Sequence, residues 1–210
     1  MANSTVHSTK YLWLLRHAKA TQHGRRGGSD YDRPLTTRGR RDASALGHRL
    51  AAGVGVFGLD EVALPQVALS SAATRTSETA ALVAEGMAAP LVIESYRSLY
   101  QAGTESILQY IREIDDDVIS AMVVGHNPTI YRLAWELLSD EGGGSGSAGS
   151  GSAGSGSAGG PVGGRPDGRE QLKEHGFSTC SLAVMVLPIS SWSDVTEESA
   201  SLAGVFSPPY

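Results

Sequence analysis

Short apolar runs alternate along the chain with stretches in which apolar residues recur every three or four positions. The runs are typical of buried strands, and the spaced pattern is typical of helices that cover a core with one face. Strands are predicted over 11–15, 67–69, 91–93 and 119–124, and helices starting near Thr37, Ser71, Thr104 and Asn127. This alternation predicts an α/β three-layer sandwich, in which helices flank a mainly parallel central sheet.

Polar residues mark the predicted helix starts. Ser71, Thr104 and Asn127 each stand where a side chain can cap a helix, and Pro128 suits the first helical position because that position needs no amide donor. The helix that starts at Thr37 carries apolar residues at Ala43, Leu46, Leu50, Ala51 and Val54. The helix after Asn127 is predicted to reach about Leu138.

The last third of the chain departs from this pattern. Residues 142–164 consist almost wholly of Gly, Ser and Ala, which offer no apolar surface to offset the entropy of ordering. Because apolar runs return at 181–187 and 199–206, after order resumes near Phe177, we predict one domain over 1–210 with 142–164 as a flexible insertion. Turn residues between the two runs predict a closing antiparallel strand pair at the C-terminus.

Net charge and apolar content limit the classes of partner that this chain is expected to bind. The 210 residues carry a formal net charge of −5, without the clusters of Lys and Arg that bind a polyanion, so nucleic acid is not expected. The longest apolar run, near Cys180–Leu187, is far shorter than the roughly 20 residues that cross a bilayer. Without a signal-peptide pattern at the start, we expect a cytoplasmic protein that does not insert in a membrane.

Several motifs that suggest other chemistries lack their structural context. Residues 144–149 satisfy G-x-G-x-x-G, but they belong to the Gly/Ser/Ala repeat and follow no strand. Cys180 is the single cysteine, and no arginine follows at the spacing of a cysteine phosphatase, so a buried thiol in an apolar strand is predicted. The histidines show no zinc-binding spacing, and we expect neither a metal nor a cofactor.

Charged and imidazole side chains follow three of the predicted strands: Arg16 with His17, then Arg75, then His126. The carboxyl ends of parallel strands meet at one edge of a sheet, so these side chains are expected to lie together. Guanidinium groups and helix N-termini both favour the negative charge of a phosphoryl group. Singly, each residue is better explained as a surface or capping residue, but jointly they predict a phosphate pocket.

Within such a pocket, the neutral imidazole of His17 can attack phosphorus to form a phosphohistidine, which water then hydrolyses. Neighbouring arginines should lower the pKa of His17 and keep it unprotonated. A bound phosphate dianion should favour the cationic form of His126.

The same segments resemble the histidine phosphatase superfamily, in particular its SixA-type phosphohistidine phosphatases. The resemblance rests on residues 15–18, 70–79 and 124–128, and for the SixA type on 16–20, 32–36 with Gly39, and Leu99–Tyr100. It implies that His17 is the phosphorylated residue and that Arg16, Arg75 and His126 form the phosphate pocket. Lys19 and Asn127 are further candidates for substrate binding.

Two departures from larger relatives bear on the substrate. Where those relatives have Gly and later Ser, this chain has Ala18 and Ala20, and the path from Ile93 to Tyr100 leaves no room for their catalytic glutamate. An imidazole leaving group needs less acid assistance than an alkoxide, which favours phosphohistidine, on a protein, or another compact phosphorylated molecule as substrate. A broader small-molecule phosphomonoesterase or mutase, and a non-catalytic phosphate-binding module, remain as alternatives.

Overall fold

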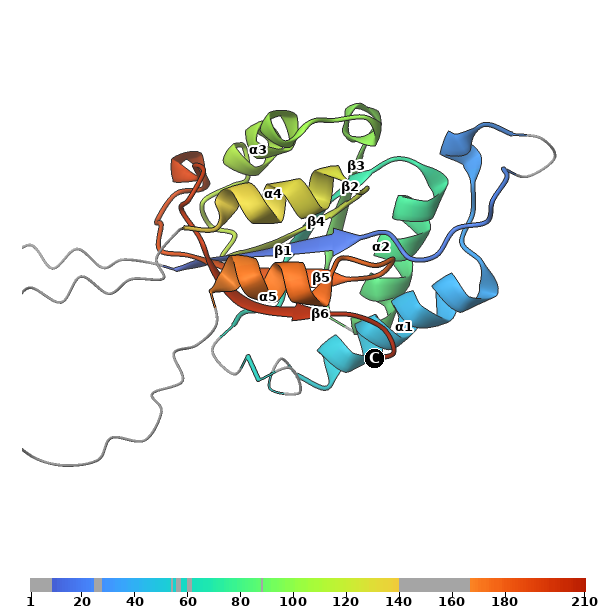
Figure 1. Ribbon diagram of the computed structural model, residues 1–210, viewed down its shortest axis with the longest axis horizontal. Coiled ribbons are helices and arrows are strands. Elements are labelled where there is room, and N and C mark those ends of the chain that lie inside the picture. The colour runs from blue at the N-terminus through green and yellow to red at the C-terminus, as the bar shows by residue number, and fades with distance from the viewer. Residues whose placement is uncertain are drawn as a thin grey trace, which may run out of the picture.

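The computed structural model describes residues 9–24, 28–53, 55, 58–59, 62–87, 89–139 and 167–210. These residues form one six-stranded sheet with the strand order β3-β2-β4-β1-β5-β6 (Figure 1). The strands are β1 (Lys10–Arg16), β2 (Val67–Ser71), β3 (Val92–Tyr96), β4 (Ser120–Gly125), β5 (Leu182–Leu187) and β6 (Ser201–Phe206). Strands β1 to β4 are parallel, whereas β5 runs antiparallel to β1 and β6 antiparallel to β5. The predicted α/β class and the closing antiparallel pair are confirmed.

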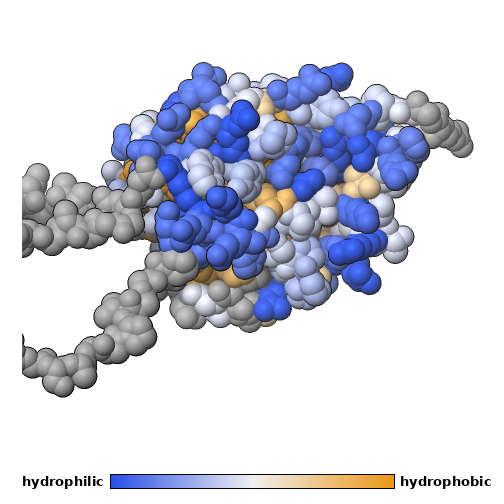
Figure 2. All heavy atoms as spheres, viewed as in Figure 1, coloured by the Kyte–Doolittle hydropathy of each residue, from blue (hydrophilic) through white to orange (hydrophobic). Residues whose placement is uncertain are grey.

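Helices cover both faces of the sheet (Figure 1). The apolar residues of α1 (Thr37–Ala51) and α2 (Thr74–Met87) pack on one face. Those of α3 (Thr104–Arg112), α4 (Thr129–Leu137) and α5 (Gly168–His175) pack on the other. Because side chains alternate along β1, Trp13 and Leu15 join the first core, and Leu12 and Leu14 join the second. The outer surface over α4 and α5 is mostly hydrophilic (Figure 2).

Helices α1 and α2 touch through glycines. A Cβ atom at Gly47 would lie 2.4 Å from the carbonyl oxygen of Val83, and one at Gly86 would lie 2.9 Å from the Cα of Gly47. Only glycine allows the two backbones to approach so closely. This contact fixes α2, whose first turn carries Arg75, relative to the rest of the fold.

Three predicted caps are wrong. Ser71 is the last residue of β2, and its hydroxyl lies 2.9 Å from Nε2 of His126. Asn127 donates a hydrogen bond from Nδ2 to the carbonyl of Phe177, so α4 begins at Thr129 with Pro128 in the capping position. In both cases a tertiary partner takes the side chain that local sequence would assign to a helix end.

The third cap differs by one residue. Gly103 occupies the capping position of α3, and Thr104 is the first helical residue. Helix α1 has Thr36 as its cap, with the side chain accepting from the amide of Gly39, and it ends at Ala51. The predicted last apolar position, Val54, lies outside the described residues.

The chain becomes regular again earlier than predicted, at α5 rather than near Phe177. Helix α5 is mostly charged, and Leu172 is its one buried residue, so it shows little helical periodicity. Cys180 is buried as predicted, but it stands in a turn before β5 with φ of 66°, not in the strand. Burial raises the pKa of its thiol to about 12, as befits a structural residue.

The arrangement of one domain with an insertion at 142–164 stays a prediction, because 142–164 lies outside the described residues. No helix among the described residues combines the length and apolar character needed to cross a membrane.

Candidate active site

Three parallel strands end beside one another at one edge of the sheet. In the pairing of β1 with β4, Arg16 lies opposite Gly125, and the amide of His17 donates to the carbonyl of Gly125 at 3.0 Å. The residues after these strand ends, His17 and His126, therefore become neighbours, with ring centroids 5.3 Å apart. Strand β2 ends next to β4 and supplies Ser71.

The imidazole of His17 is held in one orientation and one tautomer. Its Nδ1 lies 2.8 Å from the carbonyl oxygen of Ala18. Since a carbonyl can only accept, Nδ1 carries the hydrogen and Nε2 keeps its lone pair. The Ala18 amide in turn donates to the buried hydroxyl of Thr79 on α2 at 3.0 Å, which fixes this turn.

The electrostatic environment keeps His17 neutral. Its pKa is lowered from 6.5 to about 4, chiefly by burial; the hydrogen bond to Ala18 opposes the shift, and the charges of Arg75, Arg16 and Arg33 add to it. The arginines thus act in the predicted direction, although desolvation is the larger cause. At neutral pH the ring is an unprotonated base.

His126 is also neutral in the free site. Its pKa falls to about 3, chiefly because the ring is buried and also because Arg75 and His17 lie near it. Nε2 lies 2.9 Å from the hydroxyl of Ser71, while Nδ1 is buried and has no hydrogen-bond partner among the described residues. The predicted cationic form of His126 would require the charge of a bound anion.

Arg16 and Asn127 converge on the same carbonyl. Nη1 of Arg16 donates to the Phe177 oxygen at 2.7 Å, and Nδ2 of Asn127 donates to it at 2.9 Å. Within the described part of the chain, Nε of Arg16 and Oδ1 of Asn127 are buried without a partner. Burial also lowers the pKa of Arg16. These two side chains therefore bring unused hydrogen-bonding atoms to the edge that holds both histidines.

Arg75 is almost buried, with 7% of its surface exposed, and it is bound on one side by Asp30. Nη1 donates to the main-chain oxygen of Asp30 at 2.6 Å, and Nη2 donates to its Oδ2 at 3.0 Å. The hydroxyl of Tyr100 donates to the same Oδ2 at 2.7 Å, and Nη1 of Arg33 donates to Oδ1 at 2.6 Å. The Tyr100 ring also meets His126 edge to face, with centroids 5.6 Å apart.

Asp30 is the main residue that sequence reasoning missed. The bonds from Tyr100 and Arg33, with the charge of Arg75, hold the pKa of its carboxyl well below the usual range. A carboxylate that stays ionised is unsuited to donate a proton, so Asp30 does not replace the absent glutamate. Its position, two residues before Asp32 in the segment that resembles SixA, was the available signal.

Among the described residues, no side-chain hydrogen bond or ion pair joins Lys19 to this cluster, and the residue is exposed. Its main-chain oxygen accepts from the Thr36 amide at 2.8 Å, and a Cβ at Gly39 would lie 2.2 Å from that oxygen. Thr36 and Gly39 therefore hold the segment after His17 against the start of α1. Lys19 takes part in this contact through its main-chain oxygen.

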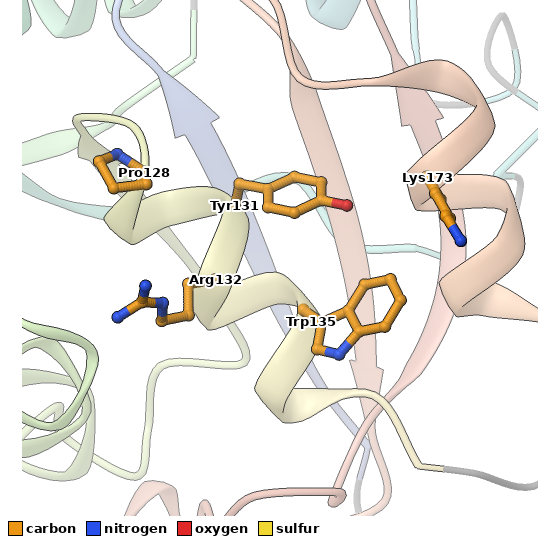
Figure 3. Close-up of a pocket in the computed structure, with 5 residues that line it drawn as sticks. All are labelled: Pro128, Tyr131, Arg132, Trp135 and Lys173. Atoms are coloured by element: carbon orange, nitrogen blue, oxygen red, sulfur yellow. The ribbon is translucent and has the colours of Figure 1, made fainter.

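A hollow of about 390 Å³ lies between α4 and α5, beside the cluster (Figure 3). Tyr131 and Trp135 extend from α4, and Lys173 faces them from α5 (Figure 3). The Tyr131 ring lies near the Phe177 ring, with centroids 6.3 Å apart, and Phe177 is the residue whose carbonyl binds Arg16 and Asn127. Among the described residues, no group of three or more His, Cys, Asp or Glu side chains is placed to hold a metal ion.

Comparison with known proteins gives consistent matches. The family model of the histidine phosphatase superfamily (branch 1) matches residues 12–98, a range that contains His17 and Arg75. The protein Rv1276c of Mycobacterium tuberculosis is 31% identical over 196 residues, which cover 92% of this chain and 99% of that protein.

Two solved structures share the architecture. The SixA structure from Nakamurella multipartitia has a TM-score of 0.67 and 25% identity, and the match covers 96% of this chain and 98% of that one. The protein histidine phosphatase SixA complexed with tungstate has a TM-score of 0.60 and 20% identity, covering 94% and 96%. At 20% identity, the match to the tungstate-bound structure shows a shared fold alone.

Proposed function

This chain belongs to the histidine phosphatase superfamily, in its SixA-type branch, and is a hydrolase; we propose that it dephosphorylates phosphohistidine through a covalent intermediate on His17. The observation that carries the proposal is the state of His17. Its Nδ1 is committed to the Ala18 carbonyl and its pKa is lowered to about 4, so Nε2 offers a lone pair at neutral pH.

The reaction would proceed in two displacements at phosphorus. Nε2 of His17 forms a bond to phosphorus, and the bond from phosphorus to the substrate nitrogen breaks. The substrate imidazole, protonated from solvent on its other nitrogen before this step, keeps the electron pair and leaves as neutral imidazole. Water then attacks the phosphoryl group on His17, the new P–N bond breaks, and its electron pair returns to Nε2. Inorganic phosphate and the free enzyme are the products.

Phosphate would be held by unpartnered nitrogen atoms of Arg16 and His126, together with Arg75. Nε of Arg16 and Nδ1 of His126 are buried and unpartnered in the described chain, and Arg75 lies near enough to lower the pKa of both histidines. A dianion placed among them would raise the pKa of His126 and turn it into a second charged donor. Such preorganised donors stabilise charge that develops in the transition state.

The substrate class follows from the missing acid. Asp30, the carboxylate bound to Arg75, is held ionised and cannot protonate a leaving group. Imidazole departs more readily than an alkoxide because it is the weaker base, so phosphohistidine suits this site better than a phosphate ester. The name of the tungstate-bound relative, protein histidine phosphatase SixA, agrees with this substrate.

The test combines labelling with turnover. Brief incubation with phosphoramidate or a phosphohistidine peptide should give an acid-labile label on the protein, and His17→Ala should abolish both label and hydrolysis. His23→Ala is the matched control, because His23 is an exposed histidine on the segment that follows. Unchanged hydrolysis in His17→Ala would contradict the nucleophile.

Substrate preference is tested separately on the unaltered protein. We expect kcat/KM for the phosphoramidate to exceed that for an alkyl phosphate of similar size by at least about 100-fold. Equal values would instead support a broad phosphomonoesterase, and phosphate binding without turnover of either compound would support a binding module.

A further inference from the structure

Arg75 of the phosphate pocket and Tyr100, whose ring meets His126, both bind one carboxylate that lies far from them in sequence. Arg75 comes from the first turn of α2 and Tyr100 from the 3-10 helix Arg97–Tyr100, and they stand 45 and 70 positions from Asp30. Both donate to Oδ2 of Asp30, and Arg75 also donates to its main-chain oxygen. The Arg75 guanidinium further lies over the Tyr100 ring, 5.7 Å from its centroid.

We propose that Asp30 is a positioning residue that holds Arg75 and Tyr100 for binding of the phosphoryl group, an inference that rests on the proposed function. Asp30 would remain on Arg75 while phosphate is bound. It would act through Arg75 and would not itself touch the substrate.

The first reason is conformational. A free arginine side chain loses up to about 2 kcal/mol of rotamer entropy when it is fixed in one position. Here Asp30 fixes the guanidinium before any ligand arrives, through one bond to each terminal nitrogen. Nε–H and the second hydrogen on each terminal nitrogen remain for an anion, so the same group can serve Asp30 and phosphate together.

The second reason is electrostatic. Arg16, Arg33 and Arg75 all lie near enough to His17 to lower its pKa, and three like charges repel one another in the free site. Asp30 accepts from Arg33 at Oδ1 and from Arg75 at Oδ2, and so places a carboxylate between them. Without it, the half-buried Arg33 and then Arg75 would gain by turning toward solvent.

The opposite role, a carboxylate that blocks Arg75 until phosphate displaces it, fits the contacts poorly. The shorter of the two bonds from Arg75 runs to the main-chain oxygen, so displacement would require the backbone of the 3-10 helix Asp30–Asp32 to move. Arg33 and Tyr100 also hold the carboxylate in place. This alternative predicts tighter anion binding once Asp30 is changed.

The test uses Asp30→Asn, which keeps the size of the side chain but removes its charge and one acceptor oxygen. Both oxygens are in use, so an amide cannot satisfy Arg33, Arg75 and Tyr100 together. We expect tungstate affinity and kcat/KM for phosphoramidate each to fall about 10- to 100-fold, the usual worth of a hydrogen bond between charged groups. Asp32→Asn is the matched control, because Asp32 belongs to the same 3-10 helix but binds only Ser29 among the described residues, and it should change either value less than about 2-fold.

Measuring Asp30→Asn in a protein that already carries a second substitution distinguishes a positioning role from general damage to the segment around Asp30. If Asp30 acts through Arg75, then Asp30→Asn should have almost no further effect in a protein that already carries Arg75→Ala. An equal loss in both backgrounds, or tighter tungstate binding by Asp30→Asn, would overturn the proposal. Tungstate binding to His17→Ala carrying Asp30→Asn reports on Asp30 even if the proposed chemistry at His17 fails.

Discussion

Each end of β1 carries a buried or half-buried cation, and the two cations differ in how completely they are hydrogen-bonded. At the amino end, Lys10 is 3% exposed, and its Nζ donates to the carbonyls of Asp116 and Val118 at 2.5 and 2.9 Å. At the carboxyl end, Arg16 donates to Phe177, but its Nε is buried without a partner in the described chain. We call the amino end, where Lys10 is hydrogen-bonded within the protein, the satisfied end. We call the carboxyl end, where some buried polar atoms have no partner among the described residues, the open end.

The neighbours of these two cations follow the same division. Near Lys10, Trp13 donates to the hydroxyl of Ser120, which donates to the Ala63 carbonyl, and Trp192 donates to Val118. Near Arg16, Nδ1 of His126 and Oδ1 of Asn127 have no described partner. An unpartnered buried polar atom costs about 1–3 kcal/mol, which a ligand with matching groups can recover. We infer from this difference that the open end of the sheet serves ligand binding and that the satisfied end stabilises the fold.

Replacing Arg16 tests the open end and should have the largest effect. Arg16→Met keeps an unbranched chain but removes the charged donors, and kcat/KM for phosphoramidate should fall about 100- to 1000-fold, as when one strong transition-state donor is lost. The free energy of unfolding, measured by urea titration, should change by less than about 1 kcal/mol, because loss of the bond to Phe177 is offset by relief of a desolvated charge. A large loss of stability with retained activity would reverse the assignment of the two ends.

Replacing Lys10 tests the satisfied end with the same substitution. Lys10→Met removes a charged donor from two carbonyls, and the free energy of unfolding should fall by about 1–3 kcal/mol. The values of kcat and KM should stay within about 2-fold of the unaltered protein at a temperature where both are folded. A fall in kcat/KM comparable to that of Arg16→Met would show that the contrast between the ends is wrong.

The pH dependence of stability should also come from the open end. The pKa values of His17 and His126 lie at about 4 and about 3 in the folded protein, below the ordinary 6.5. As pH falls below 6.5 the unfolded chain takes up protons that the folded chain does not. Stability is therefore complete above this pH and decreases toward pH 4, by roughly 1.4 kcal/mol per pH unit for each histidine.

Urea titrations between pH 7 and 4.5 measure this slope. His126→Asn should make it shallower, and Lys10→Met should leave it unchanged because Lys10 lies at the opposite end of β1 from both histidines. An identical slope in the unaltered protein and His126→Asn would contradict the lowered pKa of His126.

Much of the fold was readable from the order of residues. The apolar runs that became β1, β2 and β4 are continuous because both faces of the sheet are covered, and the spacing after Thr37 matches the buried side of α1. Helix α5 could not be found in this way, because only Leu172 is buried in it. The caps at Ser71 and Asn127 were misassigned because local propensity cannot register partners such as His126 and Phe177, which lie far away in sequence.

For the site, the sequence by itself determined which residues stand at the ends of parallel strands, and that placement of His17 and His126 follows from topology alone. The tertiary structure alone decided the rest: that the Ala18 carbonyl selects the tautomer of His17, and that burial, more than the arginines, lowers its pKa. It also brought Asp30 to Arg75 and left Lys19 outside the cluster. The reason is physical, since tautomer, desolvation and ion pairing depend on distances between segments, and the order of residues along the chain does not specify those distances.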